Sequence, residues 1–231
     1  MLHNPGFNDG QGMDIHIRTK IHRWWSSIEY AAVRIGNETF EVKSGTQDRR
    51  YWVNGIEQHR YRASRHLDFS IGGFTGRFRA KSDTVVQYKL YLPEGQHLMI
   101  RSVKDMLRVE IEHPLAEYFK DSLGLMGSFS DGILMGRNGT VFAAEDTNSF
   151  GQEWQVTSED PQLFHSVEGP RYPEQCKMPE ITLEMSEARR LAQTLSREDA
   201  ETACAHVRKN DFKNCVFDVM ATDDVDAAEG Y

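Results

Sequence analysis

Nine lysine and arginine side chains fall between Lys43 and Lys81, against three acidic residues. Aromatic residues are interleaved with them, and guanidinium groups suit the recognition of carboxylates and sulfates. This stretch could therefore bind an anionic partner such as a sulfated or uronic-acid polysaccharide. The alternative is a solvated outer face over an aromatic core, because a strand would place Arg77 and Arg79 on one face and Phe78 on the other. The binding hypothesis assigns this role to Arg49, Arg50, Arg60, Arg62, Arg77 and Arg79.

Three cysteines, all in the C-terminal third, allow at most one disulfide. Cys204 and Cys215 lie at the end of one predicted helix and the start of the next, where they could form a bridge or remain two buried thiols. Cys176 would then be free or paired with another domain or subunit. Cys204, His206 and Cys215 also resemble three zinc ligands, but a fourth ligand is missing and the spacing fits no common zinc pattern. His206 on a solvated helix face is the simpler interpretation.

Sequence motifs for catalysis are absent from the chain. It contains no Gly-x-Ser-x-Gly elbow, no His-Glu-x-x-His, no phosphate-binding loop and no Gly-x-Gly-x-x-Gly. We therefore expect a protein that is not an enzyme and needs no cofactor. A hydrolase without a recognisable motif is the second alternative.

The net charge of −8 is unevenly distributed, at +4 over residues 1–120 and −12 over the remainder. The acidic C-terminal third argues against a nucleic-acid partner. No window is long and apolar enough for a membrane span, so we expect no membrane insertion. The start of the chain has no secretory signal, and the chain could be a fragment of a longer protein. Asn37 and Asn138 begin two sequons, which would carry glycans in a secreted protein.

Alternating apolar and polar residues predict antiparallel β-strands over the first ~115 residues. The pattern is clear at 13–21, at 30–42 and at 106–113, and Asn54-Gly55 predicts a hairpin turn. Beyond Pro114 we expect a short helical turn, a strand at 139–143 and a Gly-bearing connection at 147–156. From residue 181 onward the pattern is helical, with Ser196 as a predicted N-cap.

The fold class expected is mainly β, an antiparallel β-sandwich or meander followed by a small C-terminal helical segment. We divide the chain into a β domain at 1–156, a Pro-containing linker at 157–180 and a helical Cys-bearing extension at 181–231.

Three tracts resemble the von Willebrand factor type D domain in a cysteine-poor form. They are Gly124-Leu-Met-Gly-Ser-Phe-Ser130, Gly139-Thr-Val-Phe142 and Ser149-Phe-Gly-Gln-Glu-Trp-Gln-Val156. The tail from Ala203 to Tyr231 is similar to the Cys-bearing helical segment that follows such domains. The family's opening strand is missing, so the resemblance implies a module that is incomplete at its N-terminus.

The resemblance implies an extracellular, adhesive role and a Cys204–Cys215 disulfide. In the family, the Gly-rich loop binds Ca²⁺, and its ligand positions fall on Ser128 and Ser130, with Asp131 as the nearest carboxylate. Ca²⁺ takes six to eight oxygen ligands, so one carboxylate and two hydroxyls would bind it weakly. The alternative is a Gly-rich turn with Phe129 in the core.

Our leading hypothesis is a non-enzymatic, extracellular structural or adhesive module, secreted or part of an ectodomain. Its partners would be other matrix proteins or neighbouring domains of the same protein. The first alternative is a module that binds an anionic polysaccharide through the 43–81 stretch.

Overall fold

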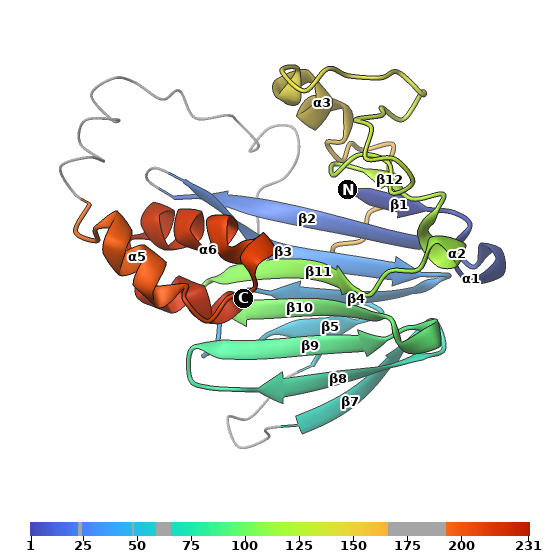
Figure 1. Ribbon diagram of the computed structural model, residues 1–231. Coiled ribbons are helices and arrows are strands. Elements are labelled where there is room, and N and C mark those ends of the chain that lie inside the picture. The colour runs from blue at the N-terminus through green and yellow to red at the C-terminus, as the bar shows by residue number, and fades with distance from the viewer. Residues whose placement is uncertain (23–24, 48, 59–65, 166–192) are drawn as a thin grey trace.

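A computed structural model describes residues 1–22, 25–47, 49–58, 66–165 and 193–231. The chain is mainly β, a curled antiparallel sheet with a small helical part at its C-terminus (Figure 1), as the sequence predicts. The strands are β1 Leu2–Asn4, β2 Met13–Ile21, β3 Ser26–Ile35, β4 Glu38–Lys43, β5 Tyr51–Val53, β6 Ile56–Gln58, β7 His66–Ile71, β8 Phe74–Ala80, β9 Val85–Tyr91, β10 His97–Val103, β11 Met106–Glu112 and β12 Leu123–Gly124. The helices are α1 Phe7–Gly10, η1 Pro93–Gly95, α2 Ala116–Phe119, α3 Thr147–Glu153, α5 Arg197–Ala203, α6 Lys209–Thr222 and η2 Val225–Gly230.

The long strand β3 is the point at which the sheet divides. On one side it pairs with β2 along its length. On the other side its second half pairs with β4, and Ile28 near its start pairs with Leu107 of β11. One branch therefore runs β3-β4-β5-β6, and the other runs β3-β11-β10-β9-β8-β7. The twist of β-strands curls the two branches toward each other.

Aromatic side chains fill the space between the two branches. The Phe40 ring from β4 stacks on Phe69 from β7, with centroids 4.2 Å apart. Tyr51 from β5 and Tyr88 from β9 both contact Phe40, at 5.9 and 5.8 Å. Phe78 of β8 is fully buried against Tyr88. The interior of the β domain is therefore an aromatic core closed by both branches.

The outer face of β2 is covered, although its alternating sequence is typical of a half-exposed strand. The side chains of Asp14 and His16 are 4% and 1% exposed. A segment far along the chain crosses this face of the sheet, where Phe164 packs against Tyr30 of β3 and the Arg18 guanidinium lies 4.1 Å from the Phe164 ring. The apolar residues at the start of β2 still face the core. The polar residues there are buried by contacts from other segments, among them His3 and Arg34, whose side chains both contact the Asp14 carboxylate.

A second, smaller core holds the C-terminal helices together. Ser196 caps α5 in a reciprocal box with Asp199, as the sequence predicts. Val216 and Val219 of α6 pack with Ala200 of α5 and with the buried Cys204 and Cys215.

Ion pairs from Lys104 hold this helical unit against the sheet. The Lys104 ammonium lies 2.5 Å from Asp224 and 2.7 Å from Asp226. Among the helices of the described ranges, none is both long and apolar enough to cross a membrane.

Two elements differ from the predictions. Residues 147–153 of the predicted Gly-bearing connection form helix α3, and the predicted strand at 139–143 contributes only an isolated bridge between Met135 and Val141. Trp154, at the end of α3, is buried and its indole N–H donates to the Met135 carbonyl at 3.0 Å. A helix of seven residues with no regular apolar spacing leaves little periodic signal.

Candidate cationic site on the outer face of the sheet

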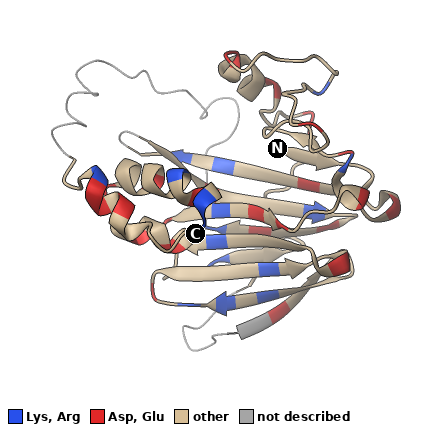
Figure 2. Ribbon diagram, viewed as in Figure 1, with Lys and Arg blue, Asp and Glu red and all other residues tan. Residues whose placement is uncertain are grey.

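The outer face of β8, β9 and β10 carries a group of cations that we call the cationic face. Phe78, Tyr88 and Ile100 point into the core, so the alternating residues of the same strands point outward. Blue bands on these neighbouring strands mark the cations in Figure 2. The cationic face consists of Arg77, Arg79, Lys81, Lys89 and Arg101.

The strand register sets like charges directly opposite one another. Arg77 of β8 is the partner of Lys89 on β9, and Arg101 of β10 is the partner of Arg108 on β11. Like charges at opposite positions destabilise a sheet by about 0.2–1 kcal/mol per pair. The fold therefore tolerates two repulsive pairs on a single surface.

Carboxylates offset only part of this charge. Arg77 pairs with Asp68 at 3.0 Å and Lys89 lies 3.7 Å from Glu112. Arg101 donates to Glu110 at 2.7 Å and to Glu112 at 2.8 Å. Within the described ranges, Arg79 and Lys81 have no ion pair or hydrogen bond to another side chain.

A shallow depression of about 870 Å³ lies over these residues. All five members of the cationic face line it, with Asp68 and Glu112 as the acidic residues of its lining. Five cations against two carboxylates make this depression positive on a chain whose net charge is −8. An anion would meet a concave, polar surface with an excess of donors.

Tyr91 gives the depression an aromatic member. Its side chain is 36% exposed, and the Arg77 and Lys89 cations lie 5.8 and 5.6 Å from its ring centroid. His97, its partner on β10, lies edge-on at 5.3 Å. Burial, with Lys89 as the next cause, lowers the pKa of His97 below the ordinary value of a histidine.

The structure does not bring the six predicted arginines together. Arg49 is buried and donates to the Thr46 carbonyl at 2.8 Å. Arg50 pairs with Glu57 at 2.7 Å and lies 5.2 Å from the Trp52 ring, on the opposite branch of the sheet. Arg60 and Arg62 lie outside the described residues. Of the four predicted arginines that the structure describes, Arg77 and Arg79 belong to the cationic face.

Lys81, Lys89 and Arg101 complete this face and were missed from the sequence. The alternation of Val86, Tyr88 and Leu90 with Gln87 and Lys89 was a usable signal for the orientation of Lys89. Their closeness to Arg77 and Arg79 depends on strand register, which has no local signal.

The Gly-rich loop uses its polar groups within itself. The Ser130 hydroxyl donates to the Lys120 carbonyl at 2.7 Å, and the Asp131 carboxylate accepts from the Ile133 amide at 3.1 Å. Ser128 is buried, and its amide donates to the Ile133 carbonyl. Phe129 is 40% exposed and packs on Phe119, so it lies at the margin of the core and not inside it.

Among the residues described by the structure, no three His, Cys, Asp or Glu side chains form a metal-binding group. This includes the region of Cys204, His206 and Cys215. His206 is exposed, and one ring nitrogen lies 3.0 Å from the Ala203 carbonyl oxygen. The two cysteine sulfurs are bonded to each other.

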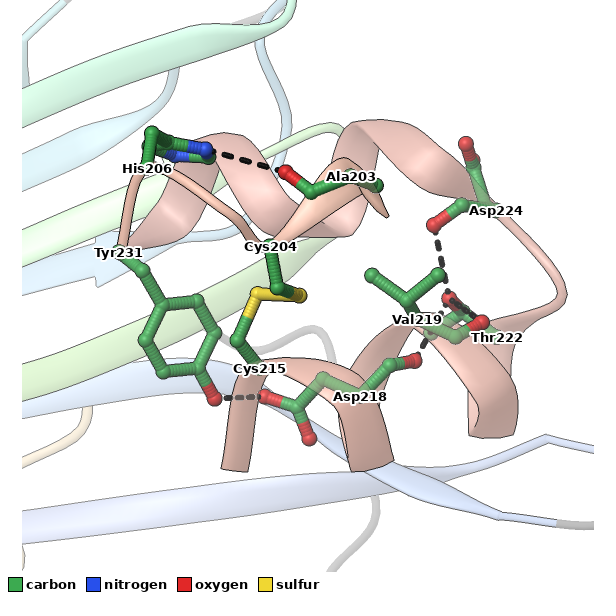
Figure 3. Close-up of a disulfide and its surroundings, with 9 residues drawn as sticks. All are labelled: Ala203, Cys204, His206, Cys215, Asp218, Val219, Thr222, Asp224 and Tyr231. Carbon is green, nitrogen blue, oxygen red and sulfur yellow. Dashed lines mark hydrogen bonds between the residues drawn. A yellow bond between two sulfur atoms is a disulfide. The ribbon is translucent and has the colours of Figure 1, made fainter. Parts of the chain in front are cut away.

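The Cys204–Cys215 disulfide joins α5 to α6, with Cα atoms 6.0 Å apart. Figure 3 shows this bridge between the two helices. Both residues are 0% exposed. Cys176 lies outside the described residues. The two sequon asparagines, Asn37 in the β3–β4 turn and Asn138 in the loop before α3, are both exposed.

A scan against protein-family models finds none that matches this chain, and a search of the curated proteins finds no match either.

Proposed function

We propose that the chain is a non-enzymatic, extracellular interaction module whose cationic face binds an acidic polysaccharide. The observation that carries this proposal is the excess of cations over carboxylates in the depression over β8, β9 and β10, where Arg77 is the register partner of Lys89. The resemblance to von Willebrand type D domains supports a structural or adhesive setting for such a module.

A polyanion bound across the strands would convert this repulsion into attraction. Adjacent strands are about 4.8 Å apart, so cations on three neighbouring strands present a charged row at regular intervals. Arg79 has no carboxylate partner in the described ranges, so its donors are available without breaking an ion pair. Arginine forks bind carboxylate and sulfate groups with two parallel hydrogen bonds.

A sugar polymer also fits the exposed ring of Tyr91. The apolar face of a pyranose packs on an aromatic ring, and here two cations lie close to the ring centroid, Arg77 at 5.8 Å and Lys89 at 5.6 Å. Acidic sugars would place their carboxylates or sulfates beside Arg77 and Lys89. Single-stranded nucleic acid stacks on similar platforms, and the binding experiment separates the two.

The extracellular part of the proposal is supported by the buried disulfide and the exposed sequons. Disulfides persist in oxidising compartments and are rare in the cytosol. Non-reducing peptide mapping of protein from its native source tests this part. We expect a linked Cys204–Cys215 peptide and a glycan on Asn37 or Asn138, whereas three free thiols and bare asparagines would refute it.

The binding part is tested by calorimetry with heparin, alginate and an oligothymidylate as probes. The face variant carries Arg77→Gln, Arg79→Gln and Lys89→Gln. Its matched control carries Arg197→Gln, Lys209→Gln and Lys213→Gln, which remove the same charge from exposed positions on the helices. We expect polysaccharide affinity that weakens as salt rises, and a loss of about tenfold or more in the face variant only.

Equal losses in the two variants would mean that net charge alone governs binding, and would refute the site. Tighter binding of the oligothymidylate than of either polysaccharide would reassign the face to nucleic acid.

A further inference from the structure

A groove of about 440 Å³ lies where the helical extension meets the sheet. One wall is formed by α6 and η2, and the other by the start of β3 and the adjoining ends of β10 and β11. The groove is separate from the cationic face, and no lining residue is shared between them. Its lining is mostly apolar, with Trp25, Phe217 and Tyr231 as its aromatic members.

Phe217 is an exposed aromatic residue of α6, a helix whose other large apolar residues pack in the second core. Its neighbour Val216 is 7% exposed and Val219 is 0% exposed in the second core, whereas Phe217 is 67% exposed. An apolar ring of this size in water costs roughly 1.5–3 kcal/mol relative to full burial. In this position the ring lies along the groove and would be covered by a ligand.

Asp218 is the carboxylate of this groove. Its side chain is half-buried and accepts a hydrogen bond of 2.5 Å from the Tyr231 hydroxyl, as Figure 3 shows. Burial raises the pKa of Asp218, although the Tyr231 hydrogen bond opposes that shift. The second carboxylate oxygen has no hydrogen-bond partner in the described part of the chain.

The cation nearest to this carboxylate is already engaged elsewhere. Arg108 lies with its guanidinium carbon 3.9 Å from the Tyr231 ring centroid. It also lies 3.6 Å from Asp211 and 3.6 Å from Glu110, so two other carboxylates share its charge. Asp218 therefore has no ion pair of its own in the described part of the chain, and Arg108 acts on it only as a charge shared with Asp211 and Glu110.

We propose that this groove binds a small organic amine whose body is an aromatic ring or a bulky alkyl group. The ammonium would pair with the free oxygen of Asp218, and the apolar body would lie between Trp25 and Phe217. A cation beside aromatic faces gains further electrostatic attraction, which a desolvated site strengthens. An acidic molecule of the same shape would meet the Asp218 charge instead, so the groove selects for amines.

The groove volume agrees with this ligand class. Small-molecule sites usually measure about 300–1,000 Å³ and combine an apolar lining with a few placed polar groups. The polar groups of this lining are the Asp218 carboxylate, the Arg108 guanidinium and the hydroxyls of Ser26, Ser27, Thr222 and Tyr231. Because Arg108 already lies beside Asp211 and Glu110, Asp218 is the charged group of the lining that is left without an ion pair in the described ranges.

The test is calorimetry of the full chain with tryptamine and with indole-3-propionate at neutral pH. These two probes share the indole and differ in the sign of their charge. We expect tryptamine to bind at least about tenfold more tightly than indole-3-propionate, a difference that corresponds to about 1.4 kcal/mol. Asp218→Asn should remove that preference, and Phe217→Ala should weaken the binding of both probes. Phe129→Ala, at another exposed aromatic position, is the matched control and should change neither.

A second measurement reports directly on the carboxylate. Tryptamine binding should release protons in the acidic range where Asp218 titrates, because a bound ammonium lowers the raised pKa of Asp218. Calorimetry in two buffers of different ionisation enthalpy measures that release, which Asp218→Asn should abolish. Equal affinity for the two probes, or an unchanged preference in Asp218→Asn, would overturn the proposal. Binding that Phe129→Ala weakens as much as Phe217→Ala would also overturn it, because it would place the probe elsewhere.

Discussion

The buried histidine of β2 should make the fold less stable in mild acid. His16 is 1% exposed, and neither ring nitrogen has a hydrogen-bond partner among the described residues. Burial is the largest cause that lowers its pKa from 6.5 to about 4. The Met1 amino group and Arg137 act in the same direction, and Asp14 and Asp160 oppose them.

The sign and size follow from proton linkage. Between pH 6.5 and about 4 the unfolded chain holds a proton on this histidine, and the folded chain does not. The contribution of His16 to stability is therefore complete above pH 6.5 and is lost as the pH falls toward 4. A difference of about 2.5 pKa units corresponds to about 3 kcal/mol, since one unit is worth about 1.4 kcal/mol.

Urea unfolding at pH 7.5 and pH 4.5 measures this loss. His16→Leu replaces the imidazole with an apolar side chain of similar size. Between pH 7.5 and pH 4.5 its free energy of unfolding should therefore fall by about 2.5 kcal/mol less than that of the parent protein. His206→Leu removes an exposed histidine and serves as the control. If His16→Leu and the parent lose the same free energy of unfolding, His16 does not remain neutral in the folded protein and the reasoning fails.

Four further predictions concern other parts of the molecule. Cys204→Ser with Cys215→Ser should lower the free energy of unfolding by about 3 kcal/mol in thermal melts, by the loop-entropy relation, and an unchanged melt would contradict this. Gly76→Ala should destabilise by about 1–3 kcal/mol, because a Cβ there would lie 2.2 Å from the Phe69 ring. Gly151→Ala in α3, where nothing lies within 4 Å, should instead stabilise by about 0.5–1 kcal/mol. Polysaccharide affinity should rise as the pH falls through the pKa of His97. A bound anion offsets the positive charge of Lys89, so it favours the protonated imidazolium form of His97. In calorimetry, His97→Gln should remove that rise in affinity.

Local signals in the sequence were sufficient to predict most strands and turns. The alternation at 13–21 matches β2, and Asn54-Gly55 forms the turn between β5 and β6 with both residues at positive φ. Ser196 and Asp199 form the predicted capping box. Each of these features depends on residues that are close together in the sequence, so a local pattern is enough to predict it.

The burial of Asp14 and His16 could not be predicted in the same way. The Asp14 carboxylate contacts His3 and Arg34, and the charged groups that act on His16 include Arg137, about 120 positions away in the sequence. Alternation shows which residues share a face of a strand, and it carries no signal for what covers that face. The predicted arginine patch failed as a single surface for a related reason, because Arg50 and Arg77 are close in sequence but lie on opposite branches of the sheet.

The helical extension determines where the cationic face ends. Its acidic residues pair with cations at the β10–β11 end of the sheet, where Asp211 contacts Arg108 and Asp224 contacts Lys104. Figure 2 shows acidic residues along the helices at that end. Arg79 and Lys81 lie on the β8 side and have no such partners in the described ranges. The acidic C-terminal third therefore neutralises one end of a basic sheet face and leaves the other end available for an anion. The excess of acidic residues in the C-terminal third, visible in the sequence, therefore limits the extent of the proposed binding surface in the folded chain.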